Sequence, residues 1–447
     1  MSTIFTEWKI LTRMGAPILL AQLAQMANGV IDTIMAGHAS AKDLAGVGIG
    51  SSIWIPVLFF FAGILSALQP NISEFKGANK LTLIMPCLWQ GIYIAIVSSL
   101  LMIIILVNID PILVLLKLDT ETFAIAQGYL VAFSWGVPAM LLLLALRGLT
   151  DGMGFTSIFM SFSILTSLFN LPLNYAFIYG FDSGLFEIPA LGGIGCGWAT
   201  SLANWLAFLL CLIYLHWNSV FRQFHLFHQR TKPHWQEIKK LLHLGLPIGT
   251  AIFVEVSMFC MIALFLAPLG ATTVAAHQIV LNATSVLFML ALSLGMALTL
   301  RISYLIGSEQ PHIARQLARS SILLAILIAC FNVPILFFGR DVIAATYTND
   351  EVVKDIARHL ILFAAIFQIA DVVQVTMVHV LRGFKDTKIP MLIMILAFWG
   401  ICLPLGYSLT FTDWIIPATG ASGFWIALIV GLSCAACLLT WRVMKRA

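Results

Sequence analysis

Twelve apolar runs of about 20 residues or more follow one another along this 447-residue chain, and each could cross a bilayer as a helix. Apolar residues make up 60% of the chain and charged residues 10%, with a mean hydropathy of +0.99, which excludes an ordinary soluble globular protein. The sequence therefore predicts an all-α polytopic membrane protein with twelve transmembrane helices. The runs cover residues 15–36, 46–70, 84–109, 122–146, 155–180, 192–217, 241–269, 273–300, 317–339, 355–381, 387–410 and 418–441.

The basic residues lie mainly in alternate connections between the runs. Only five of the 24 Lys and Arg belong to the other set of connections, namely Lys42, Lys117, Arg340, Lys354 and Arg358. Because cytoplasmic connections carry the excess of basic residues, this bias predicts an even number of spans and both termini in the cytoplasm. The net charge of +4 is thus a mark of topology and does not indicate nucleic-acid binding.

The sequence contains no motif for enzymatic chemistry. The eight Cys are scattered, mostly within the runs, and indicate neither a disulfide framework nor a zinc site. The chain has no G-x-x-x-x-G-K-[ST] loop for a nucleotide, no G-x-S-x-G and no H-E-x-x-H, and its longest polar connection is too short for a catalytic domain. We expect a protein that is not an enzyme, has no cofactor and draws its energy from an ion gradient.

Short stretches recur at a separation of about half the chain, which predicts a tandem duplication of six spans. Since six is even, both halves cross the membrane in the same sense, and we expect a pseudo-two-fold axis along the membrane normal with substrate bound between two six-helix bundles. The recurring pairs are "MGAPI" and "LGLPI" (14–18, 244–248), "ALRGLTD" and "VLRGFKD" (145–151, 380–386), and "NLPLNY" and "CLPLGY" (170–175, 402–407). The predicted parts are an N-terminal bundle over 1–216, a basic cytoplasmic linker over 217–240 and a C-terminal bundle over 241–447.

Only three of the 20 acidic residues lie inside the runs, and they are Asp32, Glu255 and Asp371. Their counterparts in the other half of the repeat are uncharged, so the acids do not belong to the shared scaffold. A charge at the centre of a bilayer costs roughly 2.5 to 3.5 kcal/mol on insertion scales, so an acid kept there usually marks an ion or proton pathway. A structural hydrogen bond between helices is the alternative.

Polar amide and hydroxyl side chains accompany these acids at helical spacing. Sodium prefers oxygen ligands, which Asp32 could supply together with the side-chain carbonyls of Asn170 and Asn174, whereas a proton needs only one acid. The residues leave the choice between Na⁺ and H⁺ open. Amides that join helices by hydrogen bonds are the alternative interpretation of the supporting residues. The candidate supporting residues are Gln25, Asn170, Asn174, Thr200, Gln278, Asn282 and Gln368.

Several stretches carry a family signal: "VIDTIMAGH" (30–38), "NLPLNYAFIYG" (170–180), "EVSMF" (255–259), "AAHQI" (275–279) and "FQIADVVQ" (367–374). In combination, and over essentially the whole chain, they resemble the multidrug and toxic compound extrusion family, specifically its NorM branch. The resemblance implies a monomeric transporter of the bacterial inner membrane, in contact with membrane lipid. Such a transporter exports small-molecule drugs and bulky organic cations by alternating access, in antiport with Na⁺ or H⁺.

The resemblance also implies where cations bind. The carboxylates that match Glu255 and Asp371 are implicated in cation binding within the C-terminal bundle, with sodium as one occupant. A second cation or proton site in the N-terminal bundle is formed by the set that matches Asp32, Asn170, Asn174 and Thr200. A flippase of lipid-linked precursors would share this architecture and remains the alternative. It should line its cavity with Arg or Lys for phosphates, and we expect no basic residue deep in a run.

Overall fold

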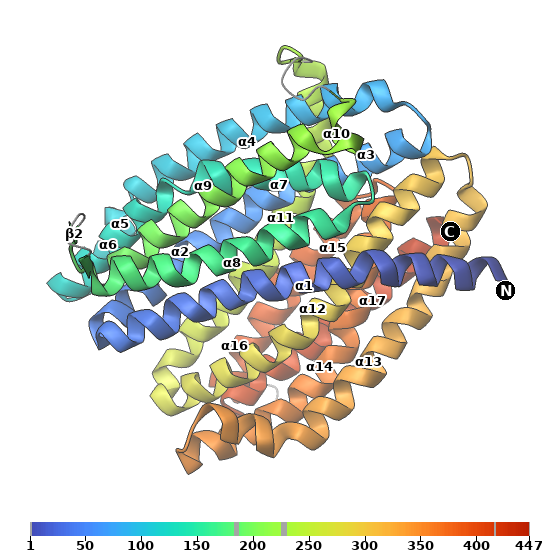
Figure 1. The fold of residues 1–447 in the computed structure, drawn as a ribbon. Helices are drawn as coiled ribbons and strands as arrows, with labels where there is room; N and C mark the ends of the chain where they lie inside the picture. Colours follow the sequence, from blue (N-terminus) through green and yellow to red (C-terminus); the bar gives the residue numbers. More distant parts are fainter. Residues whose placement is uncertain (1, 183–186, 225–229, 415–416, 447) are drawn as a thin grey trace. The chain divides into compact units, whose positions relative to one another are not determined.

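The computed structural model describes residues 2–182, 187–224, 230–414 and 417–446, which are helical apart from loops and one short β-hairpin (Figure 1). The first half of the chain forms α1 (Ser2–Ala39), α2 (Ala41–Leu65), α3 (Leu68–Gly77), η1 (Leu81–Leu83), α4 (Ile84–Val107), α5 (Asp110–Leu115), α6 (Thr120–Ser134), α7 (Val137–Gly152), α8 (Thr156–Tyr179), β1 (Phe181–Asp182), β2 (Glu187–Ile188), α9 (Gly193–Trp217) and α10 (Ser219–Arg222). The second half forms α11 (Trp235–Leu266), η2 (Ala267–Leu269), α12 (Ala271–Gly307), α13 (Pro311–Tyr347), α14 (Glu351–Gly383), α15 (Lys388–Ile395), the π-helical η3 (Leu396–Cys402), α16 (Leu403–Phe411) and α17 (Ala421–Arg446).

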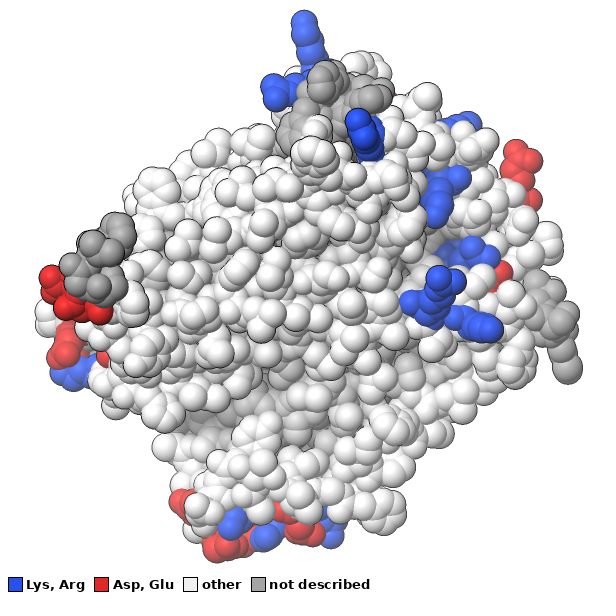
Figure 2. Space-filling view, in the orientation of Figure 1, with Lys and Arg blue, Asp and Glu red and all other residues white. Residues whose placement is uncertain are grey.

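Within the described residues, eleven helical segments are long and apolar enough to cross a membrane, and a bent pair makes up to twelve. The prediction of an all-α, twelve-span protein is confirmed. Figure 2 shows charged side chains at the ends of the helices and a broad uncharged surface between them, as expected of faces in contact with lipid.

One predicted span, 122–146, is broken in the structure. It consists of α6 and α7, which are bent by 45° relative to each other. A Cβ on Gly136, at the break, would lie 2.6 Å from the Cα of Ser201, so the approach of α9 requires a glycine here. Pro138 follows in the first turn of α7, where its missing amide hydrogen costs no helical hydrogen bond.

The contacts of the chain divide it into two compact units, one of Met1–Leu19 with Thr250–Ala447 and the other of Leu20–Gly249. The division therefore falls inside α1 and α11, just after Pro17 and Pro247 of the repeated stretches. The bundle limits read from the repeat, 1–216 and 241–447, stay a prediction about the sequence and are not the limits of these compact units.

In the first unit, α14 packs against α12, α13 and α17 around a core that includes the fully buried Phe398, Phe424 and Trp425 (Figure 1). The beginning of α1 belongs to this unit through a two-pronged ion pair. The Nε and Nη2 atoms of Arg301 on α12 donate to the two carboxylate oxygens of Glu7 at 2.6 and 2.8 Å. These contacts attach the start of α1 to α12.

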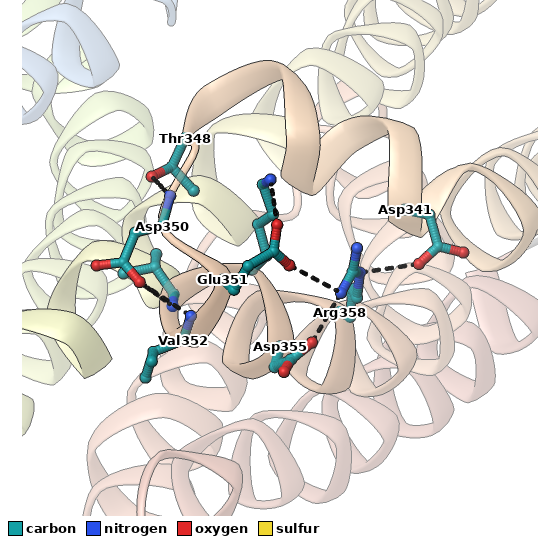
Figure 3. Close-up of polar contacts among 9 residues, drawn as sticks. Asp341, Thr348, Asp350, Glu351, Val352, Asp355 and Arg358 are labelled. Carbon is teal, nitrogen blue, oxygen red and sulfur yellow. Dashed lines mark hydrogen bonds and ion pairs between the residues drawn. The ribbon is translucent and has the colours of Figure 1, made fainter.

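A second ion-pair cluster fixes the connection between α13 and α14 (Figure 3). The Arg358 side chain lies 2.9 Å from the Asp341 carboxylate, in the last two turns of α13, and 2.7 Å from the Asp355 carboxylate one turn away on α14. Asp350 caps the start of α14, where its Oδ1 accepts from the backbone N–H of Val352 at 2.9 Å. The cluster is largely exposed, so we assign it an orienting role for the two helix ends.

In the second unit, α9 packs against α6 and α8, and α4 packs against α7. The core includes Tyr129, Phe133 and Leu88, and the Trp54 ring stacks on Phe133 with 4.2 Å between centroids. Asp43 near the start of α2 accepts a hydrogen bond from the backbone N–H of Gly193, so it caps the first turn of α9. The packing of α8 and α9 against each other positions the polar cluster described below.

We expect Glu7→Gln to lower the thermal stability of the purified protein. The side chains of Arg301 and Glu7 are only 17% and 6% exposed, and removal of one partner from a buried ion pair costs about 3 to 5 kcal/mol. The measurement is the temperature at which the monodisperse peak is lost in size-exclusion chromatography. Lys240→Gln is the control, because its ion pair with Glu237 is exposed and should contribute little. Equal melting of Glu7→Gln and the parent protein would contradict this role.

Candidate functional site

A ring of hydrogen bonds surrounds Asp32 in the second unit. The Nδ2 of Asn174 donates to Asp32 Oδ1 at 2.6 Å, and the Thr200 hydroxyl donates to Asp32 Oδ2 at 3.1 Å. Asn174 Nδ2 also donates to Asn170 Oδ1 at 2.9 Å, and Asn170 Nδ2 donates to Thr200 Oγ1 at 3.2 Å. The structure thus brings together all four residues that the sequence assigns to an N-terminal site.

The ring is assembled from three helices. Asp32 comes from α1 and Thr200 from α9, while Asn170 and Asn174 lie one turn apart on the same face of α8. Asp32, Asn170 and Asn174 are all buried. The sulfhydryl of Cys196, which the sequence did not indicate, donates to the Asp32 backbone carbonyl at 3.7 Å. Cys196 lies four residues before Thr200 and thus on the same face of α9, and this spacing could have indicated that it lies near the ring.

The donors of this ring stabilise a charged carboxylate, and one acceptor is left over. The buried Asn174 Oδ1 has no hydrogen-bond partner among the described residues. Rotation of this amide by half a turn would exchange its nitrogen and oxygen and aim the oxygen at Asp32, which only a cation or a protonated acid would tolerate. The ring therefore contains the oxygen atoms for a sodium ion and an acid for a proton.

The acids of the first unit, Glu255 and Asp371, are placed differently. Glu255 on α11 and Asp371 on α14 are close enough to interact electrostatically, and Asp371 is only 3% exposed. Within the described part of the chain, no hydrogen bond to either carboxylate is present. Two interacting carboxylates repel each other when both are charged, and a proton or a bound cation would relieve this repulsion.

Among the described residues, none of the predicted supporting residues of the first unit hydrogen-bonds to Glu255 or Asp371. The amide of Gln368 is used by other helices, since its Nε2 donates to the Thr284 backbone carbonyl and its Oε1 accepts from Asn332, each at 3.2 Å. Gln278 and Asn282 are exposed. In the second unit Gln25 is exposed as well. Gln368 thus fits the interpretation as an amide that joins helices.

Two arginines of the repeated "LRG" stretches lie inside α7 and α14 but just after the predicted spans 122–146 and 355–381, so the expectation of no basic residue deep in a run is not contradicted. Arg147 on α7 is 7% exposed and lies 2.9 Å from the Asp151 carboxylate, and its Nη1 donates to Gln22 at 3.3 Å. Arg382 on α14 donates to Nε2 of His379 at 3.1 Å and interacts electrostatically with Glu255. The recurrence of "LRG" in both halves was the sequence signal for these arginines.

The fold and these residues define a polytopic helical membrane protein with buried acids in each of two compact units. The family model of MatE matches residues 17–176 and again residues 247–408, which agrees with the internal repeat. The chain belongs to the MatE family of multidrug and toxic compound extrusion proteins, within its NorM branch.

Similar proteins cover the chain almost completely. A probable multidrug resistance protein NorM of Shewanella oneidensis is 40% identical over 435 residues, which is 97% of this chain and 94% of the relative. A multidrug resistance protein MdtK of Photorhabdus laumondii is 40% identical over 453 residues, with 99% and 96% covered. The solved structure of the Vibrio cholerae MATE transporter VcmN in its bent form has the same fold, with a TM-score of 0.81, 20% identity, and 100% and 98% of the two chains covered.

Proposed function

We propose that this protein is a secondary active multidrug efflux transporter, which exports bulky organic cations in antiport with Na⁺ or H⁺ by alternating access. One observation carries the proposal: Glu255 and Asp371 interact electrostatically as an acid pair, and no described residue hydrogen-bonds to either carboxylate. The names of the NorM and MdtK relatives support the substrate class. On this proposal the protein lies in the bacterial inner membrane with both termini in the cytoplasm, and it works as a monomer.

Competition for the acid pair would produce the exchange. A carboxylate in this environment can pair with a cationic drug or hold a proton or sodium ion, and occupation by one lowers the affinity for the others. Since a bound cation also relieves the repulsion between Glu255 and Asp371, the pair favours occupation by one of these cations over the doubly charged empty state. Exchange then requires no nucleotide and no covalent intermediate.

The ring around Asp32 would act as a second cation or proton site. In the described arrangement, Asn174 and Thr200 donate to Asp32 and substitute for a cation. A proton on one carboxylate oxygen of Asp32 would turn that oxygen into a donor and weaken the hydrogen bond it now accepts, and a sodium ion would attract the free Asn174 oxygen. Either occupant would rearrange the hydrogen bonds between α1, α8 and α9, which is how we propose that coupling reaches the helices.

The test of the function is efflux of a cationic dye such as ethidium from cells that express the protein, with sodium and pH gradients imposed separately. We expect one of the two gradients to drive efflux, and efflux to stop when that gradient is dissipated although ATP is still present. Cells that express Glu255→Gln at the same level are the control. Efflux that continues at the same rate without either gradient would contradict the proposal.

We also expect the two acids of the first unit to act as one coupled unit. Groups that interact this closely bind ions and protons together, so the losses of Glu255→Gln and Asp371→Asn should not add. The measurement is the rate of ion-driven efflux for both single variants and the double variant, expressed as free energies. A double variant whose loss equals the sum of the single losses would show that the acids act at separate sites.

A further inference from the structure

The repeated arginine of the two halves has a different ion-pair partner in each. In "ALRGLTD" the arginine and the aspartate pair with each other, because Arg147 Nε lies 2.9 Å from Asp151 Oδ2. In "VLRGFKD" the aspartate instead forms ion pairs with two arginines of α17. Asp386 Oδ2 lies 2.8 Å from the side chain of Arg442 and 3.2 Å from that of Arg446. Arg382, the counterpart of Arg147, forms no ion pair among the described residues of this unit.

The end of the helix explains this difference. In the first half α7 continues to Gly152, so Arg147 and Asp151 lie one helical turn apart on the same face. In the second half α14 already ends at Gly383, and Lys385 has a positive φ of 59°. The N–H groups of Lys385 and Asp386 return to the carbonyls of Arg382 and Leu381, each at 2.9 Å, which closes the helix. The turn carries the Asp386 side chain to α17 and leaves Arg382 without it.

His379 holds Arg382 in place. Its Nδ1 lies 2.9 Å from the backbone carbonyl of Val375, and since a carbonyl only accepts, Nδ1 carries the proton. Its Nε2 is therefore the acceptor for Arg382 Nη1 at 3.1 Å. The ring fits closely against Gly295, where an added Cβ would approach it to 2.8 Å, and the His379 carbonyl accepts from Thr299 at 2.8 Å. The guanidinium is thus anchored by a neutral group that leaves its charge uncompensated.

The charge of Arg382 acts on Glu255. Asp371 and Arg382 are eleven residues apart on α14, hence on the same face and about 16 Å apart along the helix axis. Glu255 interacts electrostatically with both of them, by repulsion with Asp371 and by attraction with Arg382. Of the other charged groups on neighbouring helices, Arg301 is paired with Glu7.

We propose that Arg382 is a built-in counter-cation of Glu255, which favours the charged form of the Glu255 carboxylate and weakens the binding of transported cations to the acid pair. This inference rests on the proposed function of the acid pair and adds a positioning residue to it. A fixed positive charge beside Glu255 opposes binding of any other cation by repulsion, and it stabilises the carboxylate after the cation has left. Release of the driving ion and of the drug would be faster for that reason.

The test compares the parent protein with Arg382→Gln, Arg382→Met and Arg382→Lys in proteoliposomes. The driving cation is varied as Na⁺ at fixed pH, or as H⁺ in sodium-free buffer if protons drive the parent protein. We expect the half-saturating concentration of that cation to fall about tenfold in both neutral variants, with a lower maximal rate because release becomes slower. Arg382→Lys keeps the charge and should stay close to the parent.

Arg147→Gln is the matched control, because it removes the repeat-related arginine whose partner is Asp151. It should lower thermal stability and leave the half-saturating concentration unchanged. A neutral Arg382 variant that purifies as a monodisperse protein and keeps the half-saturating concentration of the parent overturns the inference. For a variant too slow to transport, equilibrium binding of the same cation to the detergent-purified protein gives the same comparison. A parent protein that shows no dependence on either cation overturns the proposed function itself, so the two failures are distinct.

Discussion

Glu255→Gln and Asp371→Asn are each expected to reduce ion-driven efflux by about tenfold or more, since hydrogen bonds and ion contacts to charged groups contribute about 1.5 to 3 kcal/mol each. Both substitutions keep the shape of the side chain and remove its negative charge. The charge is what a drug cation, a sodium ion or a proton would bind. The repeat-related positions in the other half of the chain carry no acid that could substitute for Glu255 or Asp371. Efflux and drug resistance in cells are the measurements.

Membrane insertion provides the control for this prediction. Removal of a buried charge should ease insertion rather than hinder it, so both variants should reach the membrane in normal amounts. Gln368→Ala is a useful comparison, because Gln368 lies on the same helix but its amide is bound to Thr284 and Asn332. It should lower stability more than transport. An acid variant that is present in the membrane and still confers parental resistance would contradict the assignment.

The second large effect is expected for Asp32→Asn, which should impair transport although Glu255 and Asp371 are intact. The substitution removes the charge that Asn174 and Thr200 stabilise and leaves their donors facing an amide. Asn170→Ala and Asn174→Ala should cause smaller losses, because only the acid can neutralise a bound ion or carry a proton. The order of effects follows from the chemistry of the ring, in which one member is charged and the others are neutral.

The measurement for the ring around Asp32 is efflux as a function of external sodium and, separately, of external pH. A sodium site predicts that Asp32→Asn changes the sodium dependence, and a proton site predicts a change in the pH dependence. Thr200→Ser is a conservative control, since it keeps the hydroxyl that donates to Asp32. If Asp32→Asn matches the parent protein in both titrations, the ring is structural and coupling resides in the acid pair of the first unit.

Much of this fold can be predicted from the sequence, because each span satisfies its own backbone hydrogen bonds and is recognisable as a long apolar run. The bend between α6 and α7 is harder to predict. Gly136 and Pro138 stand in the run, but only the approach of Ser201 shows that the glycine is required. The division of α1 and α11 between two compact units likewise depends on packing partners far away in the sequence.

The candidate site shows a similar limit. The spacing of Asn170 and Asn174 on one helical face predicts that they act together, and the structure places both beside Asp32. The amides of the first unit have the same spacing, yet Gln368 is bound to other helices. Periodicity gives the face of a helix but not the neighbour that covers it. The lack of an ion-pair partner for Arg382 among the described residues could not be predicted for a related reason, because the identical "LRG" motif is followed by a different helix end in each half.

The most direct test of the central claim is transport by the purified protein in proteoliposomes that contain no nucleotide. Uptake of an organic cation such as ethidium is measured after an outward gradient of Na⁺ or of H⁺ is imposed, with the Glu255→Gln and Asp371→Asn double variant as the reference. The account predicts accumulation against the concentration gradient with one of the two ions and none with the double variant. Equal accumulation by the parent and the double variant, or none by the parent under either gradient, would contradict it.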